Sequence, residues 1–208
     1  MKLASPKKAA AVGLILVVAL AASVFYALKL PPFEEVGKIE AGDVCKSLGD
    51  SSRAATSLKE VLPEESDYSF RDVENSIRTE GPGRSYETYC FVEGGGKQLV
   101  VAKAELMEYD VTDRWVEEVV EQLVPASSLS PFTAGDKAVA SGSVAAIYVP
   151  CYSTGSDRHL SVVVQLKKGS GIGESERRAE LVGMAENAAA YAHSRAKCDM
   201  PSAVDEQG

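Results

Sequence analysis

Apolar residues are distributed in two ways along this chain, as one unbroken run near the N-terminus and as periodic positions in the remainder. Residues 9–28 carry no charged side chain. As a helix, a run of this length spans about 30 Å, which matches the hydrocarbon core of a bilayer. Pro31 and Pro32 follow the run and would end the helix. The pattern therefore predicts a transmembrane helix over residues 9–30.

Charge is placed asymmetrically around this predicted helix. Three lysines lie among the first eight residues, and the first acidic residue is Glu34. Because positively charged flanks stay inside, we expect residues 1–8 to be a cytoplasmic tail and the bulk of the chain to be extracellular. A cleaved signal peptide is the alternative, with a small-x-small site near residues 19–21, although its apolar core would be shorter. Both interpretations export the remainder, and no cysteine directly follows the run to carry a lipid anchor.

Residues 31–42 show no periodic spacing of apolar residues and are predicted to be a linker. Beyond them, apolar residues recur at the spacing of helices or strands. Helices are predicted from Asp43 to Pro63 with an interruption at Gly49-Asp50, from Thr112 or Asp113 to Pro125, and from Glu174 to about Lys197. Strands are predicted over 68–73, 86–92, 99–107, 137–150 and 159–166, with turns at 81–83, 94–96 and 141–143 and loops at 126–136 and 154–158.

The order of these elements predicts an α+β domain over residues 43–199, in which an antiparallel sheet of hairpins packs against about three helices. The chain has 208 residues, of which 45% are hydrophobic, so it can form one domain with a core and an appendage. Residues 200–208 are polar, and we expect them to be a disordered tail.

All four cysteines lie beyond the predicted membrane helix, at Cys45, Cys90, Cys151 and Cys198. An even number in an exported domain indicates two disulfides. Of the three pairings we favour Cys45–Cys90 with Cys151–Cys198, because each bridge then joins a predicted helix to a predicted strand in its own half. Each would contribute about 4 kcal/mol in the chain-entropy model. Zinc is the weaker alternative, since no two cysteines stand in Cys-x-x-Cys spacing.

The two predicted hairpins share a spacing. Each of Cys90 and Cys151 is followed by a glycine four residues later and by a leucine nine residues later. This match indicates either a duplication or two hairpins of similar design.

No motif for catalysis, metal or nucleotide binding stands out. His159 at a strand start is expected to be an exposed edge residue, and His193 is expected near the end of the last helix. The glycines at 169, 171 and 173 lack the spacing of a phosphate-binding loop. The acidic pairs 64–65 and 117–118 are expected to be solvated, and Trp115 to belong to the core because it lies on an apolar helix stripe. We therefore predict a protein that is not an enzyme and has no cofactor.

The formal net charge of −8 argues against a nucleic-acid partner, because phosphate contacts need clustered Lys and Arg. The predicted contacts are with the membrane through the N-terminal helix, and with an envelope protein or a small-molecule ligand through the outer domain.

Residues 43–102 carry a family resemblance. The features are Asp43-Val44-Cys45 with Leu48, the helix that follows, and Cys90 opening a hairpin with a glycine-rich turn at 94–96. This half of the domain resembles a family of actinobacterial exported lipoprotein-type domains of unknown function. The resemblance implies a Cys45–Cys90 disulfide and no established catalytic residues. The chain departs from the family in lacking a lipid-attachment cysteine and in having Val92 where many members have Trp.

These patterns predict a non-enzymatic, membrane-anchored extracellular binding or sensing domain at the bacterial cell envelope. The alternative is an accessory subunit of a membrane or secretion assembly, whose membrane helix would also make contacts through small residues such as Gly13.

Overall fold

The computed structural model describes residues 36–77, 85–108, 111–153 and 156–198, together with Leu20, Ser23 and Val24. The chain forms two units, Met1–Gly37 and Lys38–Gly208. Within the described residues, no helix is long and apolar enough to span a membrane. The predicted cytoplasmic tail, most of the predicted transmembrane helix, the turn at 81–83 and the tail at 200–208 lie outside these residues.

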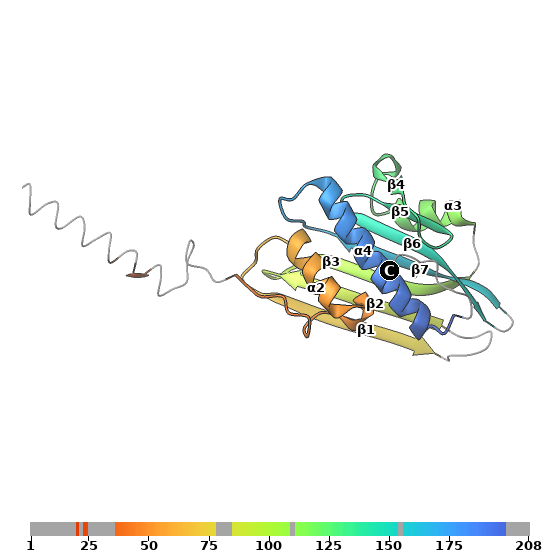
Figure 1. Cartoon of the computed structure of the whole chain (residues 1–208), viewed down its shortest axis with the longest axis horizontal. Coiled ribbons are helices and arrows are strands. Elements are labelled where there is room, and N and C mark those ends of the chain that lie inside the picture. The colour runs from red at the N-terminus through yellow and green to blue at the C-terminus, as the bar shows by residue number, and fades with distance from the viewer. Residues whose placement is uncertain are drawn as a thin grey trace, which may run out of the picture. The chain divides into compact units, whose positions relative to one another are not determined.

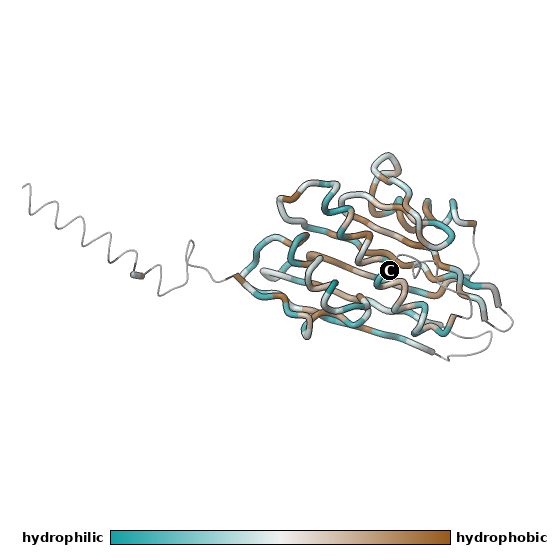
Figure 2. Tube along the Cα trace, viewed as in Figure 1, coloured by the Kyte–Doolittle hydropathy of each residue, from teal (hydrophilic) through white to brown (hydrophobic). Residues whose placement is uncertain are grey.

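The second unit contains a seven-stranded antiparallel sheet with the strand order β1-β2-β3-β7-β6-β5-β4 (Figure 1). Hydrophobic residues recur along its central strands (Figure 2). The strands are β1 Tyr68–Ile77, β2 Ser85–Gly94, β3 Lys97–Glu108, β4 Ser130–Pro131, β5 Lys137–Ala140, β6 Val144–Ser153 and β7 Ser156–Leu166. The predicted α+β class with an antiparallel sheet of hairpins is confirmed.

One face of the sheet is covered by helices that lie side by side, α2 (Ser51–Val61) and α4 (Glu174–Arg195), with the 3-10 turn η1 (Lys46–Leu48) (Figure 1). Their apolar faces bury the larger core against alternate strand residues. The first helix was expected to start at Asp43 and to be interrupted at Gly49-Asp50. The start is wrong, because residues 41–44 form turns and a bend, whereas the interruption is confirmed. Gly49 has a φ of +79°, which ends η1, and the Asp50 carboxylate then caps α2 by accepting from the amides of Ser52 and Arg53.

The opposite face has a smaller core under the segment α3 (Thr112–Trp115) and the π-helical turn η2 (Val116–Val120). Trp115 is 1% exposed, which confirms the predicted core position. Its ring stacks on Tyr148 with 5.0 Å between centroids, and its Nε1 donates to Ser161 Oγ at 2.9 Å. The helix predicted to run to Pro125 is therefore shorter and irregular, because the π turn carries Val120 into the core.

Three strands extend clearly further than predicted. β1 continues to Ile77, β6 runs past residue 150 to Ser153, and β7 begins at Ser156, where a loop was expected up to Arg158. The pairing of Ser153 with Ser156 continues the ladder with β6 to its end, so the backbone groups of these residues bond to a partner strand.

The strand order places two three-stranded units side by side, β1-β2-β3 and β7-β6-β5. The two cysteines that share the sequence spacing do not occupy equivalent positions in the strand pairing of these two units. Cys90 lies opposite Ala102, whereas Cys151 lies opposite Arg158, so the hairpins beyond the two cysteines differ in length.

Candidate functional site

All four cysteines are paired in the structure, and both predicted bridges are confirmed. Cys45–Cys90 ties η1 to β2 with 5.8 Å between Cα atoms. Cys151–Cys198 ties β6 to the segment after α4 with 4.6 Å between Cα atoms. Because both bridges lie on the helix-covered face, they fix the two ends of the helical layer to the sheet.

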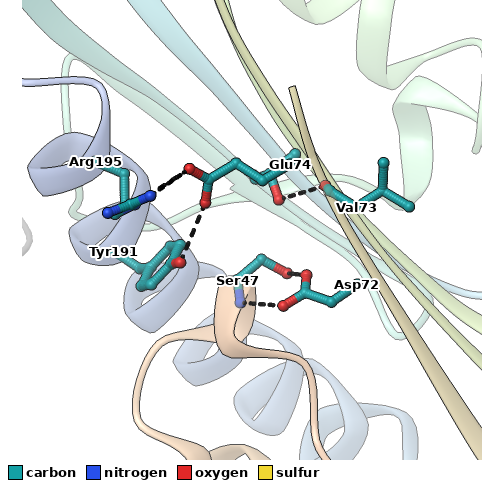
Figure 3. Close-up of polar contacts among 7 residues, drawn as sticks. Ser47, Asp72, Val73, Glu74, Tyr191 and Arg195 are labelled. Atoms are coloured by element: carbon teal, nitrogen blue, oxygen red, sulfur yellow. Dashed lines mark hydrogen bonds and ion pairs between the residues drawn. The ribbon is translucent and has the colours of Figure 1, made fainter. Parts of the chain in front are cut away.

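Two carboxylates on β1 reinforce this attachment (Figure 3). Glu74 accepts from Arg195 Nη2 at 2.6 Å and from the Tyr191 hydroxyl at 3.3 Å. Asp72, which points to the same face two residues earlier, accepts from the amides of Lys46 and Ser47 at 2.8 and 3.3 Å. The edge strand thus holds the C-terminal turn of α4 through one residue and η1 through the other.

Tyr86 lies on β2 beside this cluster with an exposed fraction of 3%. Its hydroxyl has no hydrogen-bond partner among the described residues. Burial, followed by the nearby Glu74 carboxylate, raises the Tyr86 pKa well above its usual value. This hydroxyl is a buried polar atom whose desolvation is not offset by a bond.

A cavity of about 630 Å³ adjoins Tyr86 at the end of strands β1 to β3 and is lined by several acidic residues. Its carboxylates already have cationic partners within the protein. Lys103 Nζ lies 2.7 Å from Glu105 and 3.8 Å from Glu87, and Arg195 binds Glu74. The acidic character of this cavity is therefore largely neutralised by the fold itself.

The outer face of β1 to β3 carries a row of stacked side chains. Arg71 lies 4.2 Å over the Phe91 ring, Phe91 stacks on Tyr89 at 5.6 Å, and Lys103 lies 5.5 Å from the Tyr89 ring. The Tyr89 hydroxyl also donates to Glu87, and this hydrogen bond raises the Tyr89 pKa. These groups satisfy one another, so the row acts as a cross-strand stabiliser of the sheet.

A groove of about 370 Å³ runs between α2 and α4. We call it the α2–α4 groove. It is lined from α2 by Ser52, Arg53, Thr56 and Ser57 and from α4 by Gly183, Glu186 and Asn187. Burial alone raises the pKa of the Glu186 carboxyl above its usual value. At one end of η1, Gly49 lies so close to α4 that an added Cβ would stand 2.5 Å from the Asn187 carbonyl oxygen. This close approach fixes the separation of the two helices beside the groove.

The expectation that His159 is exposed is wrong. The residue is 1% exposed, its ring stacks on Tyr148 at 4.2 Å, and its Nε2 lies 3.1 Å from Asp136 Oδ2. Strand alternation places His159 on the face of β7 that bears Ser161, which receives the Trp115 hydrogen bond. His193 lies in the last turn of α4, as predicted.

The acidic pairs of the sequence do not form a site. Glu64, Glu117 and Glu118 are exposed, as predicted, whereas Glu65 is half-buried and binds Lys168 at 2.8 Å. In the described ranges, no group of three His, Cys, Asp or Glu residues is placed to hold a metal ion.

Sequence reasoning found the cysteines but missed the groove residues. The signals available were a glycine inside a strong helix pattern at Gly183 and a carboxylate one turn later at Glu186. No protein-family model, no curated protein and no solved structure matches this chain.

Proposed function

We propose that this chain is a non-enzymatic binding or sensing domain, anchored in the cell membrane by residues 9–30 and extracellular from residue 31 onward. The observation that carries the proposal is that both disulfides form within one domain and leave no free cysteine among the described residues. Structural disulfides persist in oxidising compartments and are rare in the cytosol.

The nature of the polar clusters supports binding over catalysis. The one buried histidine is stacked into the smaller core beside Trp115 and Tyr148, and the strongest carboxylate contacts hold helices to the sheet. Catalytic sites instead bring a nucleophile or an acid–base pair to an accessible cleft. The α2–α4 groove offers hydrogen-bonding groups without such a pair.

Topology in the host cell tests the proposal. The full-length chain would carry one epitope tag at each end. We expect the C-terminal tag to be accessible to antibody on intact cells, and the N-terminal tag only after permeabilisation. Lysis in an alkylating reagent without reductant should leave all four cysteines unmodified. A protected C-terminal tag or free thiols would show that the proposal is wrong.

Cross-linking on intact cells separates the binding domain from the alternative of an accessory subunit. The comparison uses the native chain and a chain whose residues 9–30 are replaced by an unrelated membrane helix. A partner retained after the exchange is bound by the outer domain, as we propose. A partner lost after the exchange depends on the membrane helix, which is the result expected for an assembly subunit.

A further inference from the structure

Gly183 has no structural reason to be glycine. It lies in the interior of α4, where glycine is less favourable than almost any other residue. Its φ is not positive, and an added Cβ would meet no atom within 4 Å. Neither packing nor backbone conformation therefore requires a glycine at position 183. Its consequence is that no side chain at this position fills the α2–α4 groove.

Glu186 lies one helical turn beyond Gly183 on the same face and also lines the groove. Its carboxyl is half-buried, and burial is the one cause that raises its pKa. In the described part of the chain no cation stands within ion-pair distance of it. Glu74, Glu87 and Glu105 each have such a partner. Glu186 is thus a partly desolvated carboxylate that the protein itself leaves uncompensated.

Other residues that line the groove supply neutral hydrogen-bonding groups. The α2 side contributes the hydroxyls of Ser52, Thr56 and Ser57, and α4 adds the Asn187 amide. Arg53 also lines the groove, but its side chain is 74% exposed and lies 3.9 Å from Asp50. Hydroxyl and amide groups around one carboxylate match a ligand with several polar atoms and one positive charge.

We propose that the α2–α4 groove binds a small polar molecule with an ammonium group, which pairs with Glu186 while its hydroxyls contact the α2 side. The proposal rests on the proposed function as a binding domain. A single carboxylate suits an ammonium ion better than a metal ion, which needs several oxygen ligands. A volume of about 370 Å³ suits a molecule of monosaccharide size. Gly183 lets that molecule approach the helix backbone.

The test uses the full-length protein in detergent micelles with both disulfides intact. Glucosamine is the probe, and N-acetylglucosamine is its matched control because it keeps the ring and removes the charge. Binding is followed by the amide resonances of Gly183 and Asn187 in the ¹⁵N-labelled protein. We expect glucosamine to shift both resonances saturably and N-acetylglucosamine to bind at least ~10-fold more weakly.

Three variants locate the site. Glu186→Gln keeps the shape of the side chain and should weaken glucosamine binding by ~10-fold or more. Gly183→Leu should abolish binding by filling the groove, and Gly183→Ala should weaken it without any risk to folding. Glu176→Gln, which removes an exposed carboxylate from the same helix outside the groove, should bind as the parent protein does.

The ammonium proposal is overturned if glucosamine shifts neither resonance, if both sugars bind equally, or if Glu186→Gln binds as the parent does. These outcomes are independent of the topology measurement. If the domain is extracellular but does not bind glucosamine, only the proposed ligand class is wrong. If the domain binds glucosamine but lies on the cytoplasmic side, only the proposed location is wrong.

Discussion

Replacing Gly183 and Gly49 by alanine should change the stability of this domain in opposite directions, although both glycines lie beside the same residue of α4. At Gly183 the new methyl group meets nothing within 4 Å, and the backbone is already helical. The substitution then gains helix propensity, which amounts to about 0.8–1 kcal/mol between glycine and alanine.

At Gly49 the same methyl group cannot be accommodated. The residue has φ +79° and ψ −121°, a conformation that costs a residue with a Cβ about 1–3 kcal/mol. The Cβ would also stand 2.5 Å from the backbone oxygen of Asn187, and backbone cannot move aside as a flexible side chain does. Forced separation of packed elements costs about 1–3 kcal/mol more. We expect Gly49→Ala to lower the free energy of unfolding by about 2–6 kcal/mol.

Urea unfolding followed by tryptophan fluorescence measures both effects. Trp115 is the one tryptophan of the chain and is buried in the smaller core, so its emission reports the loss of the sheet. With a slope of about 2 kcal/mol per molar urea, Gly183→Ala should raise the midpoint by about 0.5 M. Gly49→Ala should lower the midpoint by about 1 M or more on the same slope.

A midpoint that falls in Gly183→Ala would refute the reasoning about this position. It would show that the glycine is required by the packing of α2 on α4, and the open groove would then be a by-product of that packing. A Gly49→Ala protein with parental stability would show that η1 and α4 are not held at a fixed distance.

The remaining predictions use the same unfolding assay. Replacing Cys45 and Cys90 together by alanine should cost about 4 kcal/mol, because the bridge closes a separation of 45 residues, and an unchanged midpoint would contradict the bridge. Tyr86→Phe should leave stability unchanged or raise it by up to ~1 kcal/mol, because it removes a buried hydroxyl without a partner; a clear loss would reveal a hydrogen bond there. The pKa of Glu186 is raised in the folded state, so protonation of this carboxyl stabilises the fold. The stabilisation is complete at a pH below the usual pKa of 4.5 and is lost as the pH rises through the folded-state pKa. Glu186→Gln should therefore be more stable than the parent at pH 7 and equal to it below about pH 4; equal midpoints at both values would count against desolvation. Glu74→Gln should lower the urea midpoint only slightly, since the Arg195 partner is solvent-exposed, and a loss that persists in molar salt would contradict a surface ion pair.

The sequence predicted most of the fold because its signals were local. The hairpin β2–β3 was read from alternating apolar positions around Gly95-Gly96, and α4 from its acidic first turn and basic last turn. The disulfide pairing followed from placing each cysteine on a helix or a strand. In each case short-range pattern and long-range packing agreed.

The full length of β1 was missed because its polar residues serve contacts made far along the chain. The helix-facing positions that would be apolar in an ordinary strand hold Asp72 and Glu74. Their carboxylates bind the amides of η1 and the side chain of Arg195, which follows more than a hundred residues later. The same limit applied to His159, whose burial depends on Tyr148 and Asp136. A single-sequence pattern cannot show which polar residues will find partners in the folded state.

The pairing of charges distinguishes the groove from the other polar clusters. Arg195 pairs with Glu74, and Lys103 pairs with Glu87 and Glu105. Carboxylates paired within the protein stabilise the fold and do not need a ligand to neutralise them. Among the described residues, Glu186 is a carboxylate whose desolvation no ion pair offsets, and it lies one turn from a glycine that packing does not require. The Cys45–Cys90 bridge, the Asp72 contacts and the close approach of Gly49 to Asn187 hold the two helices at a fixed spacing. A preformed spacing reduces the ordering cost of binding. The elements that stabilise the helical layer therefore also preorganise the groove, and we expect loss of the Cys45–Cys90 bridge to weaken ligand binding even where the domain remains folded.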